Sequence, residues 1–314
     1  MSLVLDVVTF GEAMMMLVAD QAGPLEQVEG FHKRTAGAET NVAIGLARLG
    51  LRVGWASRLG DDSVGRYLLA EMQREGIDCS HVIVDAVRRT ALQFKGRVTD
   101  GSDPPVEYHR QGSAASQMQV AEIDESWLCS ARHLHSTGVF PAISDHCFEV
   151  ASKTMALMRK AGKTVSFDPN LRPSLWRSAH HMREGINELS LGAHWVLPGV
   201  EEGRFLTGHQ APEEIAGFYL ARGAQLVVVK LGAEGASYQS SEEQGFVEAV
   251  PVARVIDTVG AGDGFAVGVI SGLLEGLAPR QAVQRGTWIG ARAVQVIGDT
   301  EGLPTRLQLD QAGL

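Results

Sequence analysis

Short, valine-rich segments alternate along this sequence with longer segments whose apolar residues recur at helical spacing. The short segments are typical of strands buried on both faces, because such strands are apolar throughout rather than at every second residue. Strands that alternate with helices predict an α/β fold, with a mostly parallel central sheet and helices on both of its faces. The predicted strands are Leu3–Phe10, Arg52–Ser57, Lys163–Phe167, Trp195–Leu197 and Leu226–Lys230.

Helical periodicity is clearest in five segments between and after these strands. In the first, at 41–49, Val42, Leu46 and Leu49 fall on one face of the predicted helix. Beyond Gly262 the chain is mostly of this helical kind. The predicted helices are Asn41–Leu49, Val64–Arg74, Asp145–Lys160, Asp263–Leu274 and Pro279–Ile297.

Two segments interrupt the alternation and predict a second, smaller sheet. Residues 90–98 and 106–110 are β-rich and flank a stretch of Asp, Gly, Ser and Pro, which is the pattern of a hairpin. Residues near 23–33 add another candidate strand. A small sheet that stands off a main domain suits a lid over a site. The same pattern also fits a purely structural hairpin at a sheet edge.

The composition restricts the class of protein. Of the 314 residues, 45% are hydrophobic and 21% charged, as in globular proteins with a large core. The net charge of −9 and the lack of a Lys/Arg-rich block argue against a nucleic-acid-binding protein. The N-terminal residues do not resemble a signal peptide, and no apolar stretch approaches the roughly 20 residues of a membrane helix. We therefore expect a cytoplasmic protein without a membrane partner, with Cys79, Cys129 and Cys147 as reduced thiols.

The strongest local signal is the stretch Asp-Thr-Val-Gly-Ala-Gly-Asp-Gly-Phe at residues 257–265. Gly260, Ala261 and Gly262 let the backbone approach a ligand closely, and their N–H groups would lie at a helix N-terminus, which favours anions. Asp263 then falls in the first helical turn beside the bound anion. Because like charges repel, a carboxylate there suits a base that takes the proton of an attacking hydroxyl. A cradle for charge and an activated nucleophile are what phosphoryl transfer needs.

The whole of that stretch resembles the C-terminal signature of the PfkB family of sugar kinases. Residues 35–43, Thr-Ala-Gly-Ala-Glu-Thr-Asn-Val-Ala, followed by Leu-Ala-Arg-Leu-Gly at 46–50, are similar to the N-terminal signature of the same family. The resemblance covers essentially the whole chain. It implies a ribokinase-like, Rossmann-type α/β sandwich over residues 1–314, with a small β lid built from segments near 23–34 and 90–110.

Within the family, three segments resemble those of kinases that act on 2-keto-3-deoxygluconate. They are residues 108–114, residues 168–172 with Leu175 and Trp176, and residues 298–302. This substrate carries a carboxylate, and guanidinium groups at Arg110 and Arg172 are suited to grip a carboxylate or a phosphate. We therefore expect ATP-dependent phosphorylation of a sugar acid, most plausibly 2-keto-3-deoxygluconate, at its 6-hydroxyl.

The resemblance also implies roles for individual residues. Gly260, Ala261 and Gly262 form the anion hole, and Asp263 is the base. The substrate site is expected to include Gly37, Ala38, Asn41, Tyr108, Arg110, Arg172, Asp263 and Asp299. The nucleotide site is expected to include Asn170, Arg172, Lys230, Gly232, Glu234, Gly235, Gly260, Ala261 and Gly262.

The expected cofactors are ATP and Mg²⁺, with K⁺ as a weaker expectation. Members of the family often place an Asn-x-x-Glu segment near the magnesium ion, and this chain has Gly199 at the asparagine position and Glu202 at the glutamate position. We therefore expect Glu202 to act on the metal only indirectly. Asp257 and Thr258 resemble a monovalent-cation site. Gln93 stands where relatives often have a tyrosine, which affects the choice of sugar.

Two other interpretations stay open. One is a kinase for a neutral sugar such as fructose or ribose. The other is a sugar-sensing protein without catalysis, against which the intact Asp263 argues. The family resemblance further implies a homo-oligomer that binds only small molecules.

Overall fold

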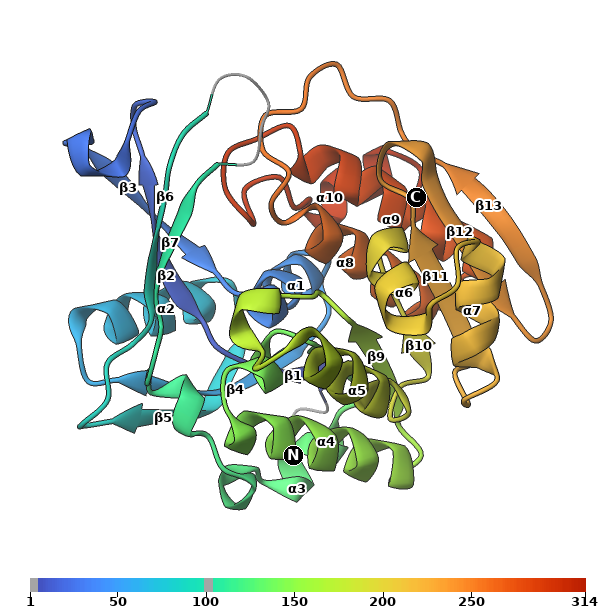
Figure 1. The fold of residues 1–314 in the computed structure, drawn as a ribbon, viewed down its shortest axis with the longest axis horizontal. Coiled ribbons are helices and arrows are strands. Elements are labelled where there is room, and N and C mark those ends of the chain that lie inside the picture. Colours follow the sequence, from blue (N-terminus) through green and yellow to red (C-terminus); the bar gives the residue numbers. More distant parts are fainter. Residues whose placement is uncertain (1–4, 99–103) are drawn as a thin grey trace.

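The computed structural model describes residues 5–98 and 104–314, and it contains two sheets (Figure 1). The larger sheet has nine strands in the order β13-β12-β11-β10-β9-β8-β1-β4-β5, and all pairs from β11 to β5 are parallel. The last two strands of the other edge, β12 and β13, are antiparallel. The strands are β1 (Val7–Phe10), β4 (Val53–Gly60), β5 (Asp78–Asp85), β8 (His133–Thr137), β9 (Thr164–Asp168), β10 (Trp195–Val196), β11 (Leu226–Lys230), β12 (Gly235–Ser240) and β13 (Gln244–Glu248).

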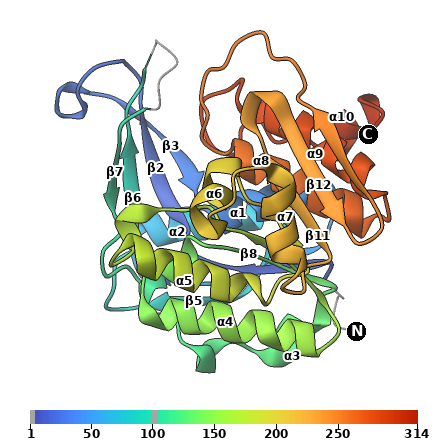
Figure 2. The ribbon, with the colours of Figure 1, turned by 45° about the vertical axis from the view of Figure 1, so that its right-hand side comes forward.

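Helices cover both faces of this sheet and form a separate core on each (Figures 1 and 2). Alternate residues of one strand enter opposite cores, as in β1, where Val7 belongs to one core and Val8 to the other. The first face carries α1 (Ala38–Arg48), α2 (Ser63–Arg74), α8 (Ala261–Leu274), α9 (Pro279–Ala293) and α10 (Arg306–Gln311). The second carries α3 (Glu125–Ser130), α4 (Asp145–Lys160), α5 (Ala179–Ser190), α6 (Val200–Thr207) and α7 (Pro212–Leu220). The doubly covered, mostly parallel sheet predicted from the sequence is thus confirmed.

The smaller sheet stands off the body, at the left of Figure 1. Its strand order is β3-β2-β6-β7. The predicted hairpin strands are present as β6 (Leu92–Lys95) and β7 (Val106–His109), which pair antiparallel, while residues 99–103 of the predicted turn lie outside the described residues. The predicted strand near 23–33 begins later, as β3 (Phe31–Ala36), and pairs with β2 (Met14–Ala19).

The register of the smaller sheet decides which of its side chains face the body. Gln93 pairs with Tyr108 and Lys95 with Val106, so these four side chains project from one face. Met14, Met16 and Val18 of β2 share that face and pack in a small core with Ile297. This face of the sheet is therefore the one turned toward the C-terminal part of the chain.

Several element boundaries differ from the sequence prediction. Residues 3 and 4 of the predicted first strand lie outside the described residues, and β1 begins at Val7. Helix α8 begins two residues before the predicted start, and α9 ends at Ala293 rather than at Ile297. The sequence analysis missed β5, β12 and β13, because these strands lie at or near the edges of the sheet and carry many polar residues.

The helices and the cysteines relate to two expectations from the sequence, on membrane spans and on reduced thiols. None of the described helices is long and apolar enough to cross a membrane. Cys79, Cys129 and Cys147 are all free thiols.

Candidate active site

The candidate active site lies at the carboxyl edge of the large sheet. From β1 the chain proceeds outward to β4 and β5, and the later strands extend from the opposite side of β1, beginning with β8. Open α/β sheets bind ligands in the crevice at such a reversal of strand order. Two acids are buried at this edge: Glu12, two residues after β1, and Asp168, the last residue of β9.

The glycine turn at the start of α8 is confined by its surroundings. Gly260, the N-cap, has φ of 84°, and a Cβ atom there would lie 2.6 Å from the backbone oxygen of Asp299. Only glycine satisfies both conditions without strain. The turn places Ala261, Gly262 and Asp263 in the first turn of α8, where N–H groups lack acceptors within the helix. The glycine turn on which the predicted anion cradle depends is therefore present, and the binding of an anion there stays a prediction.

Asp263 is buried and is held by two amide side chains. Asn41 Nδ2 donates to Asp263 Oδ2 at 2.7 Å, and Asn170 Nδ2 donates to Asp263 Oδ1 at 3.3 Å. Burial raises the pKa of Asp263 to about 7, and the Asp168 and Asp299 carboxylates add to the rise, while the Asn41 bond and Arg172 oppose it. A carboxyl with a pKa near neutrality is matched to proton transfer at that pH.

Asn41 connects this acid to the start of α1. Its amide also lies 3.4 Å from Asp299 Oδ2, so three predicted substrate-site residues form one cluster. Its Oδ1 is buried and has no hydrogen-bond partner among the described residues, which leaves an acceptor for a ligand hydroxyl. Gly37, the N-cap of α1, has φ of 146° and approaches Glu12 so closely that a Cβ would clash with its carbonyl. Ala38 follows as the first residue of α1.

Arg110, the predicted carboxylate ligand, forms a buried ion pair. Its Nη2 lies 2.6 Å from Glu12 Oε2, and the side chains are 11% and 2% exposed. The hydroxyl of Ser113 donates to the other Glu12 oxygen. Tyr108 keeps 48% of its surface exposed, and Arg110 lies 5.9 Å from its ring centre. Glu12 was not predicted from the sequence, where the only signal was an acid two residues after the first strand.

A second buried acid near this pair was also missed. Glu39, in the first turn of α1, accepts a hydrogen bond of 2.5 Å from the hydroxyl of Thr137. Burial raises the pKa of Glu39 to about 6, while the Thr137 bond and the nearby Arg110 oppose the rise. The only signal for Glu39 in the sequence was its position within residues 35–43, which resemble the N-terminal signature of the family.

Arg172, by contrast, is exposed and makes no ion pair in the described structure. Its Nη1 donates to the carbonyl of Leu171 at 2.9 Å. The segment is fixed by Glu202, whose two oxygens accept the N–H groups of Leu171 at 2.8 Å and of Gly199 at 2.7 Å. Asn170 takes a left-handed φ of 39°, which turns its amide toward Asp263. Glu202 thus positions the 170–172 segment, and its carboxylate oxygens are already hydrogen-bonded to the backbone.

Lys230 ends β11 beside the glycine turn. Its Nζ lies 2.5 Å from Asp168 Oδ2 and 3.5 Å from where a Cβ of Gly262 would lie. Although burial opposes it, the carboxylates of Asp168 and Glu202 raise the pKa of Lys230. The ammonium group therefore places positive charge next to the N-terminus of α8.

An apolar pocket of about 430 Å³ opens next to this turn. Its lining includes the predicted nucleotide-site residues Lys230, Gly232, Gly235, Ala261 and Gly262, whereas Glu234 is exposed and is not part of it. The sequence analysis did not assign the rest of the lining. Val250, Val252 and Val255 come from the loop after β13, and Phe265 comes from α8. One face of α9 and the residue after it provide Thr287, Gly290, Ala291 and Val294, which recur at helical spacing.

The predicted monovalent-cation residues have unlike surroundings. Asp257 is buried and pairs with the ammonium group of Lys95 from β6 at 2.6 Å. Thr258 lines the apolar pocket. Lys95 is a further residue that the sequence analysis missed, because nothing in the strand itself indicates a distant partner.

This chain is similar to known carbohydrate kinases over nearly its whole length. The model of the pfkB family carbohydrate kinases matches residues 4–306. The 2-dehydro-3-deoxygluconokinase of Bacillus subtilis (strain 168) is 51% identical over 306 residues, which cover 97% of this chain and 94% of that protein. A solved PfkB protein from Polaromonas sp. JS666 is 67% identical, with a TM-score of 0.91 over 98% of this chain and 99% of that one. A double mutant of the fructokinase from Vibrio cholerae O395, in a fructose-, ADP- and potassium-bound form, is 28% identical, with a TM-score of 0.85 over 99% of each chain. This chain belongs to the pfkB family of carbohydrate kinases.

Proposed function

We propose that this kinase transfers the γ-phosphoryl group of ATP to the 6-hydroxyl of 2-keto-3-deoxygluconate. The observation that carries the proposal is the position of Asp263, a buried acid with a pKa near 7, in the first turn of α8 beside the glycine turn. The relative from Bacillus subtilis, similar over nearly all of both chains, bears the name of this activity. The sugar acid is therefore the favoured acceptor within the family.

In the proposed reaction Asp263 takes the proton of the sugar hydroxyl. The hydroxyl oxygen forms a bond to the γ-phosphorus, the bond from that phosphorus to the β–γ bridging oxygen breaks, and ADP leaves. The N–H groups at the start of α8 and the Lys230 ammonium lie where they would stabilise the charge on the transferred group. Asn41 and Asn170 hold the carboxylate of Asp263 in one orientation.

We assign the adenine and ribose of ATP to the apolar pocket between the loop after β13 and α9. The pocket is lined mainly by Val, Ala, Gly and Phe, which suits a flat aromatic ring, and its polar end is Lys230 next to Gly262. Mg²⁺ bound to the phosphates would neutralise part of their charge and keep most of its water ligands. Among the described residues, no three His, Cys, Asp or Glu side chains are arranged to hold a metal ion. Both oxygens of Glu202 accept backbone N–H groups, so we propose that this carboxylate meets the metal only through water.

For the acid end of the substrate we propose Arg110 and Arg172. Arg172 is exposed beside Asn170, and its guanidinium group, which donates to the carbonyl of Leu171 through Nη1, is accessible to an anion. Arg110 is held by Glu12 at the inner edge of the small sheet, and Gln93 and Tyr108 project from the same face of that sheet. We further propose that this sheet is a lid that closes over the sugar, within a single catalytic domain. A homo-oligomer and a cytoplasmic location stay predictions.

The test is a panel of acceptors with ATP, comparing 2-keto-3-deoxygluconate with gluconate, fructose and ribose by kcat/KM. The expected result is a preference for the keto-deoxy acid over the neutral sugars fructose and ribose by at least about 10²-fold, since a charged group that is bound by arginine is hard to replace with a neutral one. A preference for fructose or ribose would replace the proposed substrate but keep the kinase. Sugar binding without any phosphoryl transfer would favour a sensor.

A further inference from the structure

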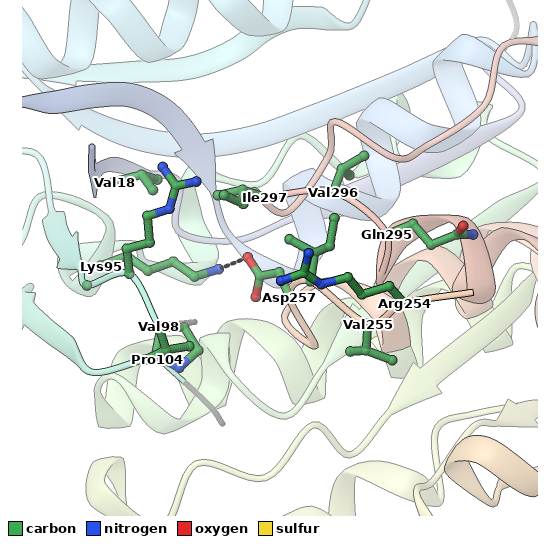
Figure 3. A pocket seen from close by; sticks show the side chains of 13 residues that line it. Val18, Lys95, Val98, Pro104, Arg254, Val255, Asp257, Gln295, Val296 and Ile297 are labelled. Atoms are coloured by element: carbon green, nitrogen blue, oxygen red, sulfur yellow. Dashed lines mark hydrogen bonds and ion pairs between the residues drawn. The ribbon is translucent and has the colours of Figure 1, made fainter. Parts of the chain in front are cut away.

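The ammonium group of Lys95 is buried between two acids of the C-terminal part of the chain. The side chain is 2% exposed, and its Nζ lies 2.6 Å from Asp257 Oδ2 (Figure 3). The same Nζ lies 3.6 Å from Asp299 Oδ1. Because a buried charge is very costly without a partner, this lysine and Asp257 depend on one another. The pair joins the small sheet to the segment that leads into α8.

Asp257 also organises the backbone on either side of the active site. Its Oδ1 accepts the N–H of Val259 at 3.1 Å, directly before the glycine turn. Its Oδ2 accepts the N–H of Gly298 at 3.2 Å, directly before Asp299. Asp299 in turn shares the amide of Asn41 with Asp263. The Lys95 ammonium group, by pairing with Asp257, therefore stabilises the segment before the glycine turn and the segment before Asp299.

The surroundings of this pair disfavour a second cation. The pocket next to it has a volume of about 600 Å³, and among the described residues its charged lining consists of Lys95, Arg97, Arg254 and Asp257 (Figure 3). Asp299 adds a second carboxylate behind this lining, and the Lys95 ammonium group lies between the two acids. A potassium ion on Asp257 would add a further positive charge beside the Lys95 ammonium, and this repulsion is poorly screened in a buried site. The residues present thus do not fit the monovalent-cation site that the family resemblance implies at Asp257.

We propose that Lys95 is the built-in cation of this kinase: its ammonium group takes the place of a monovalent metal ion at Asp257 and makes phosphoryl transfer independent of K⁺. Lys95 is a positioning residue, since it acts on the cradle through Asp257 and Asp299 rather than on the reacting atoms. The inference rests on the family's kinase activity and not on the identity of the sugar, so any acceptor that is phosphorylated serves to test it.

The experiment compares the wild type, Lys95→Met, Lys95→Arg and the control Lys33→Met in KCl and in choline chloride of equal ionic strength, with K⁺-free and Na⁺-free ATP. Lys33 is an exposed lysine of the same small sheet, so its substitution removes a lid charge without touching Asp257. Each protein is assayed for kcat and KM, and its melting temperature is measured in both salts.

The wild type and Lys33→Met are expected to show the same kcat, within about twofold, in both salts, and the same melting temperature. Lys95→Met is expected to lose about 10²-fold in kcat in choline chloride, because the cradle shifts. It is expected to recover at least about tenfold in KCl, because K⁺ can bind the Asp257 carboxylate that the substitution leaves without a counter-ion. Lys95→Arg keeps the charge and is expected to stay K⁺-independent.

Two results would overturn the proposal. One is a wild type that K⁺ activates tenfold or more, or stabilises by several degrees, with Lys95 intact. The other is a folded Lys95→Met whose rate is low and equal in all salts, which would make the lysine merely structural. If Lys95→Met does not fold, the salt response of the wild type and of Lys95→Arg still decides. A complete lack of kinase activity in the wild type would instead concern the proposed function, and the melting temperatures would remain interpretable.

Discussion

Asn41 Nδ2 lies 2.7 Å from Asp263 Oδ2, which joins the first turns of two helices that are 222 residues apart in the chain. The bond lowers the pKa of Asp263 against the dominant rise caused by burial. The amide thereby limits the rise and helps to keep the pKa of Asp263 near 7, where the carboxyl can exchange a proton during turnover. The family's two sequence signatures meet in this one contact.

Replacing the base tests the centre of this arrangement. Asp263→Asn keeps the shape of the side chain but removes the proton acceptor, so kcat is expected to fall by about 10²–10⁴-fold. ATP affinity, measured by calorimetry, should change little. Asp310→Asn, an exposed acid on α10, is the matched control and should keep full activity. A kcat for Asp263→Asn within tenfold of the wild type would exclude the assigned role.

Activity is expected to depend on pH through Asp263. The base must be ionised, and its pKa is about 7, so kcat/KM should be low well below pH 7 and rise as the pH passes through that value. In Asn41→Ala the carboxylate loses a hydrogen bond that favours its charged form. The acidic limb should therefore move upward, by about one pH unit if the bond contributes a typical charged-acceptor energy. A limb that stays in place would show that Asn41 does not tune this acid.

The ion pair of Glu12 and Arg110 predicts a non-additive effect on stability. Arg110→Ala leaves a buried carboxylate without its counter-ion and should lower the free energy of unfolding by about 3–5 kcal/mol. Glu12→Gln combined with Arg110→Ala removes both charges and should recover most of this loss. Urea unfolding of the two single variants and the double variant measures the coupling. Additive losses would mean that the two charges are effectively screened from one another.

The same cycle separates structure from substrate binding. If Arg110 also binds the substrate carboxylate, the double variant should be stable but should have a raised KM for the sugar acid. Its KM for ATP should be unchanged. An unaltered KM for the sugar acid would confine Arg110 to a structural role.

A pair of glycines tests the cradle separately from backbone strain. Gly260 and Gly276 both have φ of 84°, but a Cβ at Gly276 meets nothing within 4 Å, whereas one at Gly260 meets the backbone of Asp299. Both alanine variants should lose about 1–2 kcal/mol of stability from the left-handed conformation. Only Gly260→Ala should also lose kcat, because its Cβ displaces the start of α8. Equal activities in the two variants would argue that the cradle tolerates this shift.

Much of the fold could be predicted because its central strands are buried on both faces and therefore apolar throughout. The strands at and near the edges, β5, β12 and β13, escaped prediction because half-exposed strands carry polar residues that resemble loops. The glycine turn and Asp263 were evident from residue types alone, since a left-handed turn before a helix demands glycine. The apolar wall of the pocket on α9 was not, because small residues at helical spacing look like any buried helix face.

The sequence by itself determined the class of fold, the family, the turn at residues 260–262 and the acid that follows it, because these depend on local residue types and on short-range order. The tertiary structure decided which distant groups surround that acid and what charge they carry. Only the packing of segments far apart in the chain pairs Glu12 with Arg110, Glu202 with the backbone of Leu171, and Lys95 with Asp257. The physical reason is that burial sets the energy of a charge, and burial belongs to the folded chain rather than to any stretch of its sequence.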